Sequence, residues 1–333
     1  MSEVSALHSE ILLNHVTLPV LASLVTYQIA EKLLKGPQTA EELSASTDIN
    51  PNRLFRYLRV ASASGYFILD TLTNQWANTP KSIILTDPLS KAIWSFMGNP
   101  LIAEHFLHMT SALTSTNDPR QDRNKPNIFI ELSQNPHLLQ IFQTLMTEQT
   151  KAFMPAILKG INIREAQNLL DLGGGDGSLA IELAKTYPSI KVTVFDRAEI
   201  KGLCEHLIAQ NQVQDRVQFI EGNFFEEVPS GYDCIVLKHI LHDWTDEIVL
   251  AILRNCRNAL RTGDRIHIID ICVDHESMFY HNSLAMDTFM MMVQNGQERE
   301  LKQVEHFLGL TKFRIVGVTL VGHETDIEAE ALD

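Results

Sequence analysis

A stretch in the middle of the chain has the composition of a nucleotide-binding turn. The sequence predicts a strand over Asn168–Leu172, a turn over Gly173–Gly177 with four glycines, and a helix that begins at Ser178. Glycine adopts positive φ without steric cost and lets a ligand approach the backbone closely. The next predicted strand ends at Asp196, whose carboxylate could accept both hydroxyls of a ribose. Ligands of open α/β sheets bind at the carboxyl ends of the strands, so these residues predict a site for NAD or S-adenosyl-L-methionine.

The acidic residues of this stretch distinguish between the two cofactors. NAD requires a G-x-G-x-x-G turn that places a pyrophosphate on the helix N-terminus. Here Asp171 precedes the turn and Asp176 lies inside it, and two carboxylates are unfavourable beside a pyrophosphate. They suit a ligand that carries an α-amino group and a sulfonium. S-adenosyl-L-methionine is therefore the predicted cofactor, and an NAD-dependent oxidoreductase is the alternative.

A second stretch, Gly231–Glu247, contains a histidine that could act as a general base. The strand expected over Cys234–Leu237 leads into a short turn with His242, and Thr245 is the expected N-cap of the next helix. This order puts His242 at the carboxyl edge of the sheet. An imidazole there could take a proton from a weakly acidic hydroxyl.

Two acidic residues further along the chain could orient this imidazole. Asp270 ends a predicted strand at the same sheet edge, and Glu298 lies in a turn before a predicted helix. A carboxylate fixes the tautomer of a histidine base and stabilises its imidazolium. A purely structural role for His242 is the alternative. The spacing of His239 and His242 could also suggest a metal, but no suitable ligand set accompanies them, so none is predicted.

The elements that must position these residues change in character along the chain. From residue 161 to 333, short apolar strands alternate with helices, which predicts a doubly wound, parallel α/β sheet. Residues 101–160 show no strand signal and read as a helical connector. Within it, the sequence predicts helices over Ile102–Leu113 and His137–Leu158 and a polar loop over Asn117–Asn127.

Residues 1–100 predict a winged-helix unit. A helix is expected over Ala22–Leu34, followed by a second with capping-box spacing from Thr39 to Glu42 and a third that begins at Pro51. Two short strands, over residues 66–69 and 76–78, could then pair as a hairpin. This part carries seven basic and eight acidic residues, so a packing or dimerisation role is favoured over DNA binding. A transcription regulator with a cofactor-sensing domain is a further alternative, because Arg53, Arg56 and Arg59 lie on the third helix.

Composition limits the remaining classes. The chain has 333 residues and a formal net charge of −14, which argues against general binding to polyanions. Its four cysteines lack C-x-x-C spacing and indicate a reducing compartment. Ile11–Val25 is apolar but contains Asn14, His15 and Pro19, so we expect neither a membrane span nor a signal peptide. A cytoplasmic protein is predicted.

Motif by motif, the chain resembles the S-adenosylmethionine-dependent O-methyltransferases of the plant caffeate and hydroxyindole O-methyltransferase type, which have many bacterial members. The resemblance covers nearly the whole chain, and the His-Asp-Trp-x-Asp-Glu run is its most specific part. It implies a Rossmann-like methyltransferase domain over 161–333, a helical connector over 101–160 and a winged-helix dimerisation domain over 1–100. The stretches that carry it are Asp171–Ser178, Val194–Asp196, Gly222–Phe225, Lys238–Glu247 and Gly296–Arg299.

The resemblance also implies roles for single residues. His242 would be the general base, with Asp270 and Glu298 at the positions of its two supporting acids. Asn223 stands where the family usually has Asp, Asp270 replaces Glu, and His239 replaces a larger apolar or aromatic residue; Gln297 and Glu300 also differ from the common pattern. The predicted cofactor-binding residues are Asp171, Gly173, Gly175, Asp196, Asn223, Phe224 and Lys238.

These inferences predict transfer of a methyl group from S-adenosyl-L-methionine to a hydroxyl of a small, aromatic acceptor. Phe142, Met146, Phe289 and Met290 are the predicted pocket wall, since aromatic and methionine side chains suit flat apolar substrates. We expect a homodimer, because winged-helix units of this family exchange helices and an apolar N-terminal stretch is hard to bury in a monomer. Nucleic acid and membrane are not expected partners.

Overall fold

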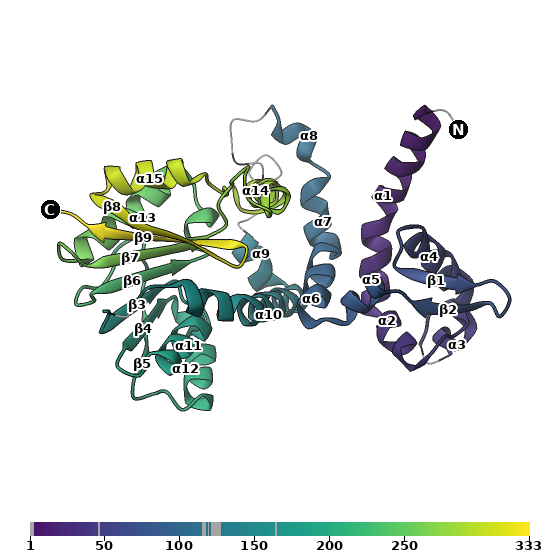
Figure 1. Ribbon diagram of the computed structural model, residues 1–333, viewed down its shortest axis with the longest axis horizontal. Helices are drawn as coiled ribbons and strands as arrows, with labels where there is room; N and C mark the ends of the chain where they lie inside the picture. Colours follow the sequence, from purple (N-terminus) through teal and green to yellow (C-terminus); the bar gives the residue numbers. More distant parts are fainter. Residues whose placement is uncertain (1–2, 46, 115–117, 119, 121–127, 164) are drawn as a thin grey trace. The chain divides into compact units, whose positions relative to one another are not determined.

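The computed structural model describes residues 3–45, 47–114, 118, 120, 128–163 and 165–333, with side chains from residue 7 onward (Figure 1). The predicted polar loop Asn117–Asn127 therefore lies outside the described residues except for Asp118 and Arg120. The chain forms two compact units. The first comprises residues 1–108 and 129–149, and the second comprises residues 109–128 and 150–333.

The first unit begins with a long helix that differs from the prediction. Helix α1 spans Glu3–Thr26, and the short α2 follows over Ile29–Lys32. The prediction of a single helix over Ala22–Leu34 is wrong. Gln28 adopts a left-handed φ of 55°, which separates α1 from α2. The segment Leu7–Thr26 is long and apolar enough to cross a membrane by length and composition alone, and 28% of it is buried. The expectation that no segment meets this criterion was thus too strict.

The rest of residues 1–100 follows its local signals closely. Helix α3 spans Ala40–Ser44 and has the predicted capping box between Thr39 and Glu42. Helix α4 spans Pro51–Ala63, with the Asn50 side chain accepting from the Arg53 amide. Strands β1 (Phe67–Asp70) and β2 (Gln75–Asn78) pair as an antiparallel hairpin. Trp76, Phe67 and Leu58 are fully buried between these elements, and their burial fixes the hairpin on the helices.

Helices make up the remainder of the first unit and the start of the second. Proline at the first turn begins several of them, as its fixed φ favours. The helix predicted over Ile102–Leu113 is split into α7 and α8. The elements are α5 (Pro80–Ile83), α6 (Pro88–Met97), α7 (Pro100–Phe106), α8 (Met109–Ala112), α9 (Ile128–Gln134) and α10 (Pro136–Gly160).

A seven-stranded, mostly parallel sheet forms the centre of the second unit, with the strand order β5-β4-β3-β6-β7-β9-β8. The order runs outward from β3 to β5, and β6 then returns to the other side of β3. This reversal makes the β3–β6 junction the switch point where ligands of such sheets bind. The parallel strands are β3 (Asn168–Leu172), β4 (Lys191–Asp196), β5 (Val217–Glu221), β6 (Cys234–Lys238) and β7 (Arg265–Asp270).

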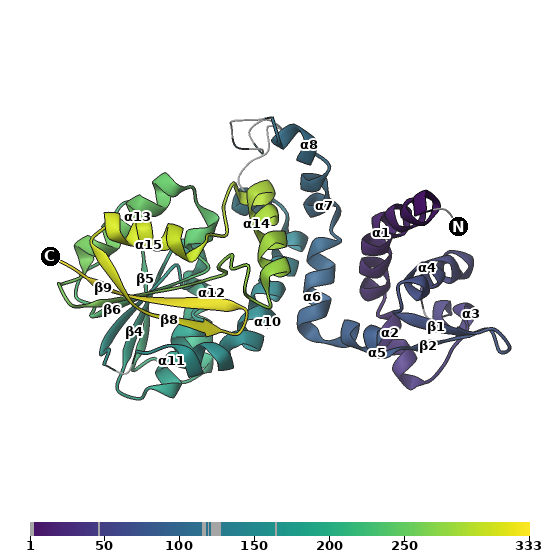
Figure 2. The same ribbon diagram turned by 45° about the horizontal axis from the view of Figure 1, so that its top comes forward.

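Helices cover both faces of this sheet (Figures 1 and 2). Alternate strand residues pack into two cores: Ile235 and Leu237 of β6 lie in one, and Cys234 and Val236 lie in the other. This double burial explains why the strands read as continuous apolar runs. One face is covered by α13 (Asp246–Ala259) and α15 (Leu301–Leu310), and the other by α11 (Ser178–Thr186), α12 (Lys201–Gln210) and the end of α10.

The last two strands were not predicted. Strands β8 (Phe313–Val321) and β9 (Glu324–Ala331) form an antiparallel hairpin at the edge of the sheet, so the sheet is not wholly parallel. The alternation typical of a strand is present in β9, where acidic residues at every second position alternate with Thr325, Ile327, Ala329 and Ala331. Helix α14 (Tyr280–Gln294) precedes α15 and contains the Met/Phe run.

Candidate active site

The carboxyl ends of the parallel strands bring most of the predicted cofactor residues to one edge of the sheet. Asp171 lies near the end of β3, Asp196 ends β4, and Lys238 ends β6. Asn223 and Phe224 follow β5 directly. The order of the strands therefore brings these residues together. The switch point between β3 and β6 lies among them.

The glycine-rich turn is open to a ligand at one position and tightly packed elsewhere. A Cβ on Gly175 would meet nothing within 4 Å, whereas a Cβ on Gly173 would lie 2.4 Å from the Ile240 side chain. Both glycines have positive φ. The Gly175 amide donates to Asp196 Oδ2 at 2.8 Å, which ties the turn to the end of β4. The turn thus offers backbone close to the Asp196 carboxylate, as a nucleoside site requires.

Asp171 is a buried carboxyl group at the base of this turn. Its side chain is 1% exposed, and Oδ2 has no hydrogen-bond partner among the described residues. Burial, followed by repulsion from Asp196, raises its pKa to about 7, while the positive charge of Lys238 acts in the opposite direction. An ionised Asp171 would attract a cationic ligand group, and that ligand would in turn favour its charged form.

Asn223 is engaged in its own loop. Its Oδ1 accepts from the Phe225 amide at 3.1 Å, and its Nδ2 donates to Glu226 at 2.8 Å. Phe224 packs against the core beneath the sheet edge, and Phe225 and Trp244 form an edge-to-face pair with ring centroids 4.7 Å apart. The loop therefore presents an aromatic surface rather than a free amide.

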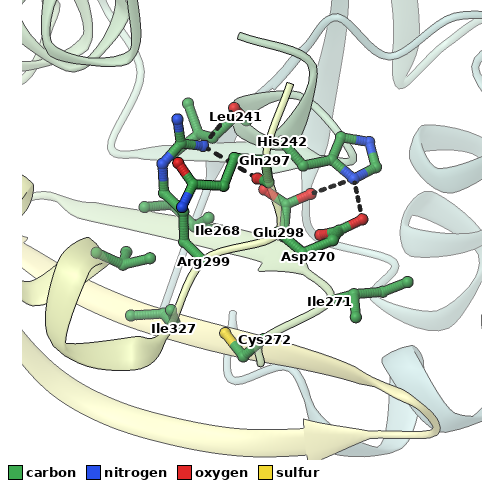
Figure 3. A pocket seen from close by; sticks show the side chains of 11 residues that line it. Leu241, His242, Ile268, Asp270, Ile271, Cys272, Gln297, Glu298, Arg299 and Ile327 are labelled. Carbon is green, nitrogen blue, oxygen red and sulfur yellow. Dashed lines mark hydrogen bonds and ion pairs between the residues drawn. The ribbon is translucent and has the colours of Figure 1, made fainter. Parts of the chain in front are cut away.

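His242 lies at the same edge with both predicted acids (Figure 3). Its Nδ1 is 3.0 Å from Glu298 Oε1 and 3.9 Å from Asp270 Oδ1. The three side chains line one small pocket and are nearly buried. Nε2 is 3.8 Å from Asp243 Oδ1, which is beyond hydrogen-bonding distance. Glu298 therefore accepts the Nδ1 proton, and Nε2 has no hydrogen bond to Asp243.

The charges around His242 make it an unusually basic imidazole. Burial by itself lowers its pKa, but the carboxylates of Glu298 and Asp270 outweigh this effect and raise the pKa from 6.5 to about 10. Burial raises the pKa of Asp270 to about 7, so this residue is only partly ionised at neutral pH. Glu298, at 3.0 Å, is the direct partner. The free protein therefore holds His242 mainly as an imidazolium at neutral pH.

Arg299 joins the two loops that carry His242 and Glu298, a role that the sequence analysis did not recognise. Its guanidinium donates to the Leu241 and Trp244 carbonyls at 2.9 and 2.7 Å and to Asp246 at 2.8 Å. A Cβ on Gly296 would lie only 2.1 Å from the His242 carbonyl, so the loop passes this close only because it has glycine there. The segment from Gly296 to Arg299 thus positions the imidazole of His242. Thr245 is the N-cap residue of α13, as predicted, although its side chain makes no capping hydrogen bond.

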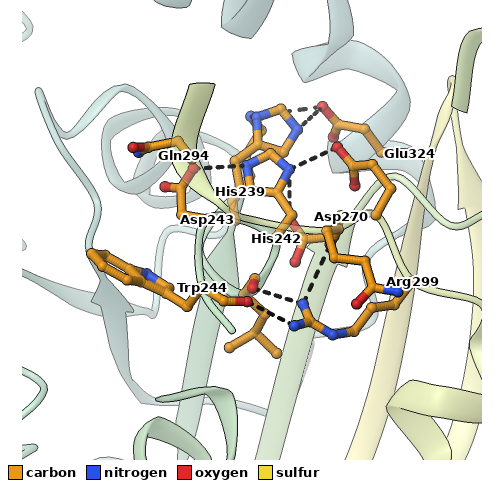
Figure 4. Close-up of polar contacts among 12 residues, drawn as sticks. His239, His242, Asp243, Trp244, Asp270, Gln294, Arg299 and Glu324 are labelled. Carbon is orange, nitrogen blue, oxygen red and sulfur yellow. Dashed lines mark hydrogen bonds and ion pairs between the residues drawn. The ribbon is translucent and has the colours of Figure 1, made fainter. Parts of the chain in front are cut away.

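Sequence reasoning also missed the partner of His239. His239 Nε2 lies 2.7 Å from Glu324 Oε1, and the rings of His239 and His242 are stacked with centroids 5.2 Å apart (Figure 4). Glu324 begins β9 and is fully buried. Since β9 was not predicted, no sequence signal linked Glu324 to this edge. Each of the two histidines has its own carboxylate partner.

The predicted pocket-wall residues fall into different units. Phe142 and Met146 lie on α10 in the first unit, where the Phe142 ring is 5.8 Å from that of Phe96. Phe289 and Met290 lie on α14 in the second unit, and Met290 is buried. A common wall made by both pairs therefore stays a prediction.

Comparison with known proteins defines the family. A model described as an O-methyltransferase domain matches residues 123–314, and the chain belongs to this family. The match includes β3 to β7, the glycine-rich turn, and the loops with His242 and Glu298. The predicted family and the predicted enzyme class, an O-methyltransferase, are thereby confirmed.

Individual relatives are also named as O-methyltransferases. The chain is 26% identical over 284 residues to the 3-O-methylredipecamine 2-O-methyltransferase of Carapichea ipecacuanha, covering 80% of this chain and 77% of that protein. It is 25% identical to the mitomycin biosynthesis 6-O-methyltransferase of Streptomyces lavendulae, and the match covers 86% of this chain and 82% of that protein.

Solved structures confirm the α/β fold across the chain. The structure of mitomycin 7-O-methyltransferase matches with a TM-score of 0.90 at 23% identity, covering 98% of each chain. Human N-acetylserotonin methyltransferase, solved with S-adenosylmethionine, matches with a TM-score of 0.84 at 20% identity, covering 100% of this chain and 99% of that one. These likenesses favour neither of the two alternative functions, the NAD-dependent oxidoreductase and the transcription regulator.

Proposed function

We propose that the protein transfers a methyl group from S-adenosyl-L-methionine to a hydroxyl of a small aromatic acceptor, with His242 as the general base. The observation that carries this proposal is the 3.0 Å contact between His242 Nδ1 and Glu298 within the O-methyltransferase domain. It fixes the imidazole so that Nε2 is the atom free to accept a proton. The cofactor also agrees with the neighbours that were solved with S-adenosylmethionine or its product.

The residues at the sheet edge fit this cofactor. The open space at Gly175 admits a ligand against the backbone, and the Asp196 carboxylate lies 2.8 Å from the same amide. The buried, unpartnered Asp171 Oδ2 supplies negative charge where a cationic amino acid moiety would lie. Asp171, Gly173, Gly175, Asp196, Phe224 and Lys238 would hold the cofactor, with Asn223 contributing through its loop. When bound, S-adenosyl-L-methionine supplies an electrophilic methyl group on a sulfonium.

The other residues would act on the acceptor. His242 would hold the hydroxyl proton at Nε2, while Glu298 stabilises the resulting imidazolium through Nδ1 and Asp270 adds negative charge. Positioning of the acceptor oxygen supplies most of the remaining acceleration. On α14, Phe289 and Met290 would form part of the wall that selects a flat, apolar acceptor. Structural neighbours include an O-methyltransferase solved with 2-hydroxy-5-methyl naphthoic acid, a flat aromatic molecule that carries a hydroxyl.

The cofactor assignment is tested by calorimetry with S-adenosylhomocysteine and with NAD. We expect binding of S-adenosylhomocysteine alone. Asp196→Ala should weaken it by roughly 1.5–3 kcal/mol, the usual contribution of charged hydrogen bonds. Asp196→Asn, which keeps one acceptor oxygen, should lose less. Asp215→Ala removes an exposed carboxylate and serves as the control, since Asp215 lies on the loop after α12. An unchanged dissociation constant in folded Asp196→Ala would place the adenosine elsewhere.

We further propose that residues 1–100 form a winged-helix dimerisation domain and that the protein is a cytoplasmic C2 homodimer. The support is the apolar surface of α1, where Leu7, Ile11 and Leu12 are more than half exposed. Exposed apolar surface of this extent on a helix indicates a missing partner. The helix–helix–hairpin order of α3, α4, β1 and β2 is that of a winged helix, and the first unit carries no charge excess that would favour DNA.

Sedimentation measures this assembly. We expect a dimer at micromolar concentration with an interface above about 2,000 Å². Replacing Ile11 and Leu12 together by Glu should give a folded monomer of 37.6 kDa. Leu72→Glu, at a fully exposed position of the hairpin, should leave the dimer intact. A wild-type monomer would contradict the proposal, and a monomer that binds lipid vesicles would assign α1 to a membrane instead.

A further inference from the structure

A second set of charged side chains lies beside the His242 cluster and has no part in the proposed proton transfer. Lys238 Nζ is 3.4 Å from His239 Nδ1 and 3.7 Å from Glu324 Oε1. His239 Nε2 is 2.7 Å from the same carboxylate oxygen, although its N–H does not point straight at it. We call these three residues, Lys238, His239 and Glu324, the Lys238 row. Figure 4 labels two of them, His239 and Glu324.

Strand register extends this row to the glycine-rich turn. Asp171 of β3 is paired with Val236 of β6, and Lys238 lies two residues beyond Val236 on the same face of the sheet. Glu324 lies on that face as well, because Asp326 of β9 is paired with Ile269, the partner of Lys238. Lys238 therefore lies between two buried carboxyl groups, Asp171 on one side and Glu324 on the other.

The contacts of His239 define its tautomer. Nδ1 accepts from the Lys238 ammonium, so the ring proton lies on Nε2, the nitrogen that is 2.7 Å from Glu324 Oε1. Burial and the charge of Lys238 lower the pKa of His239 to about 4, so the ring is neutral at pH 7. Burial raises the pKa of Glu324, but its neighbours outweigh this and lower it to about 2, so Glu324 is charged at that pH.

The backbone indicates that this arrangement is selected and not incidental. His239 has a left-handed φ of 55°, a strained conformation for a non-glycine residue, and such residues cluster at functional sites. Its amide donates to the Ile269 carbonyl at 3.0 Å, and this hydrogen bond fixes the backbone that carries the His239 ring. A fully buried Glu324 is likewise tolerated only with a partner.

We propose that His239 and Glu324 are positioning residues that hold the Lys238 ammonium next to the glycine-rich turn, so that its charge favours the ionised form of the neighbouring Asp171 for cofactor binding. This inference rests on the proposed function, because it assigns Asp171 to cofactor binding. The charged and titratable groups that face the row are His242, His323 and Asp270 as well as Asp171, and Asp171 itself also faces Asp196 and Asp176. Loss of the Glu324 charge would by itself lower the pKa of Asp171, so a rise of that pKa in a Glu324 variant reports that Lys238 has moved away from the turn.

The test follows S-adenosylhomocysteine affinity as a function of pH. In the wild type we expect affinity to fall on acidification as Asp171 is protonated. In Glu324→Gln and in His239→Asn, the pH at which half the affinity is lost should rise by about one unit, since a nearby charge shifts a pKa by roughly 1–3 units. Asparagine tolerates positive φ, so the second variant keeps the backbone. Affinity at high pH should return to within about twofold of the wild-type value in both.

The control is Glu330→Gln, the same change on the same face of β9 at its other end, where Glu330 contacts Arg265. It should keep the wild-type pH profile. A uniform loss of affinity at all pH values in the two row variants, or an unshifted profile, would overturn the positioning role. Failure of the wild type to bind S-adenosylhomocysteine at any pH would instead overturn the proposed function.

Discussion

His242→Ala and His242→Gln should lower methyl transfer by about 10²–10⁴, the usual contribution of a positioned general base. The reason is geometric: Glu298 occupies Nδ1, so Nε2 is the atom that can take the acceptor proton, and neither alanine nor glutamine replaces it. S-adenosylhomocysteine should bind both variants with nearly wild-type affinity. Single-turnover methyl transfer and calorimetry on the same preparations measure the two quantities.

A matched histidine variant separates a chemical role from a structural one. His267 is fully buried on β7 and contacts Asp326 at 3.0 Å, so His267→Gln should reduce stability without a selective loss of turnover. If His242 were only structural, its variants would behave in the same way and lose stability and cofactor binding together. Methyl transfer within threefold of wild type in His242→Ala would mean that solvent or another residue removes the proton.

Much of the second unit could be predicted because its signals are local. Strand β3 has the predicted bounds, helix α11 begins at the predicted Ser178, and the Gly173–Gly177 turn between them follows from glycine spacing alone. Once the strand order is known, the carboxyl ends of β3, β4 and β6 must meet at one edge, which brings Asp171, Asp196 and Lys238 together. The meeting of His242 with Glu298 was predicted from residue types and family resemblance, and the 3.0 Å contact places them as expected.

What escaped prediction depends on contacts between distant segments. The β8–β9 hairpin was missed although acidic residues alternate regularly with other residues along β9, and the contact of Glu324 with His239 was therefore missed as well. The end of α1 was misplaced because its break depends on the left-handed Gln28, a residue type with no strong turn signal. The basicity of His242 could not be read from its sequence neighbours, since it arises from carboxylates 28 and 56 positions away.

That basicity leads to a prediction for the pH dependence of the reaction. A base must be neutral to accept a proton, and Glu298 and Asp270 raise the pKa of His242 to about 10 against the effect of burial. The rate of methyl transfer should therefore rise with pH well beyond the ordinary histidine range of about 6.5. A bound sulfonium, being positive, should bring the midpoint down from that of the free protein. Initial rates at saturating cofactor, measured against pH, report this midpoint.

Glu298→Gln should move the rising limb of this profile to lower pH. Loss of the carboxylate removes the charge that favours imidazolium, so the pKa of His242 falls, by roughly 1–3 units for a charge this close. The maximal rate should fall as well, because a less basic imidazole accepts a proton less readily, but by less than in His242→Ala. Near neutral pH the two effects oppose each other, so the variant should lose least activity there. Glu305→Gln, a change at an exposed position of α15, should leave both the rising limb of the profile and the maximal rate unchanged. A Glu298→Gln profile with the wild-type midpoint would show that Glu298 does not set the basicity of His242, whatever its effect on the rate.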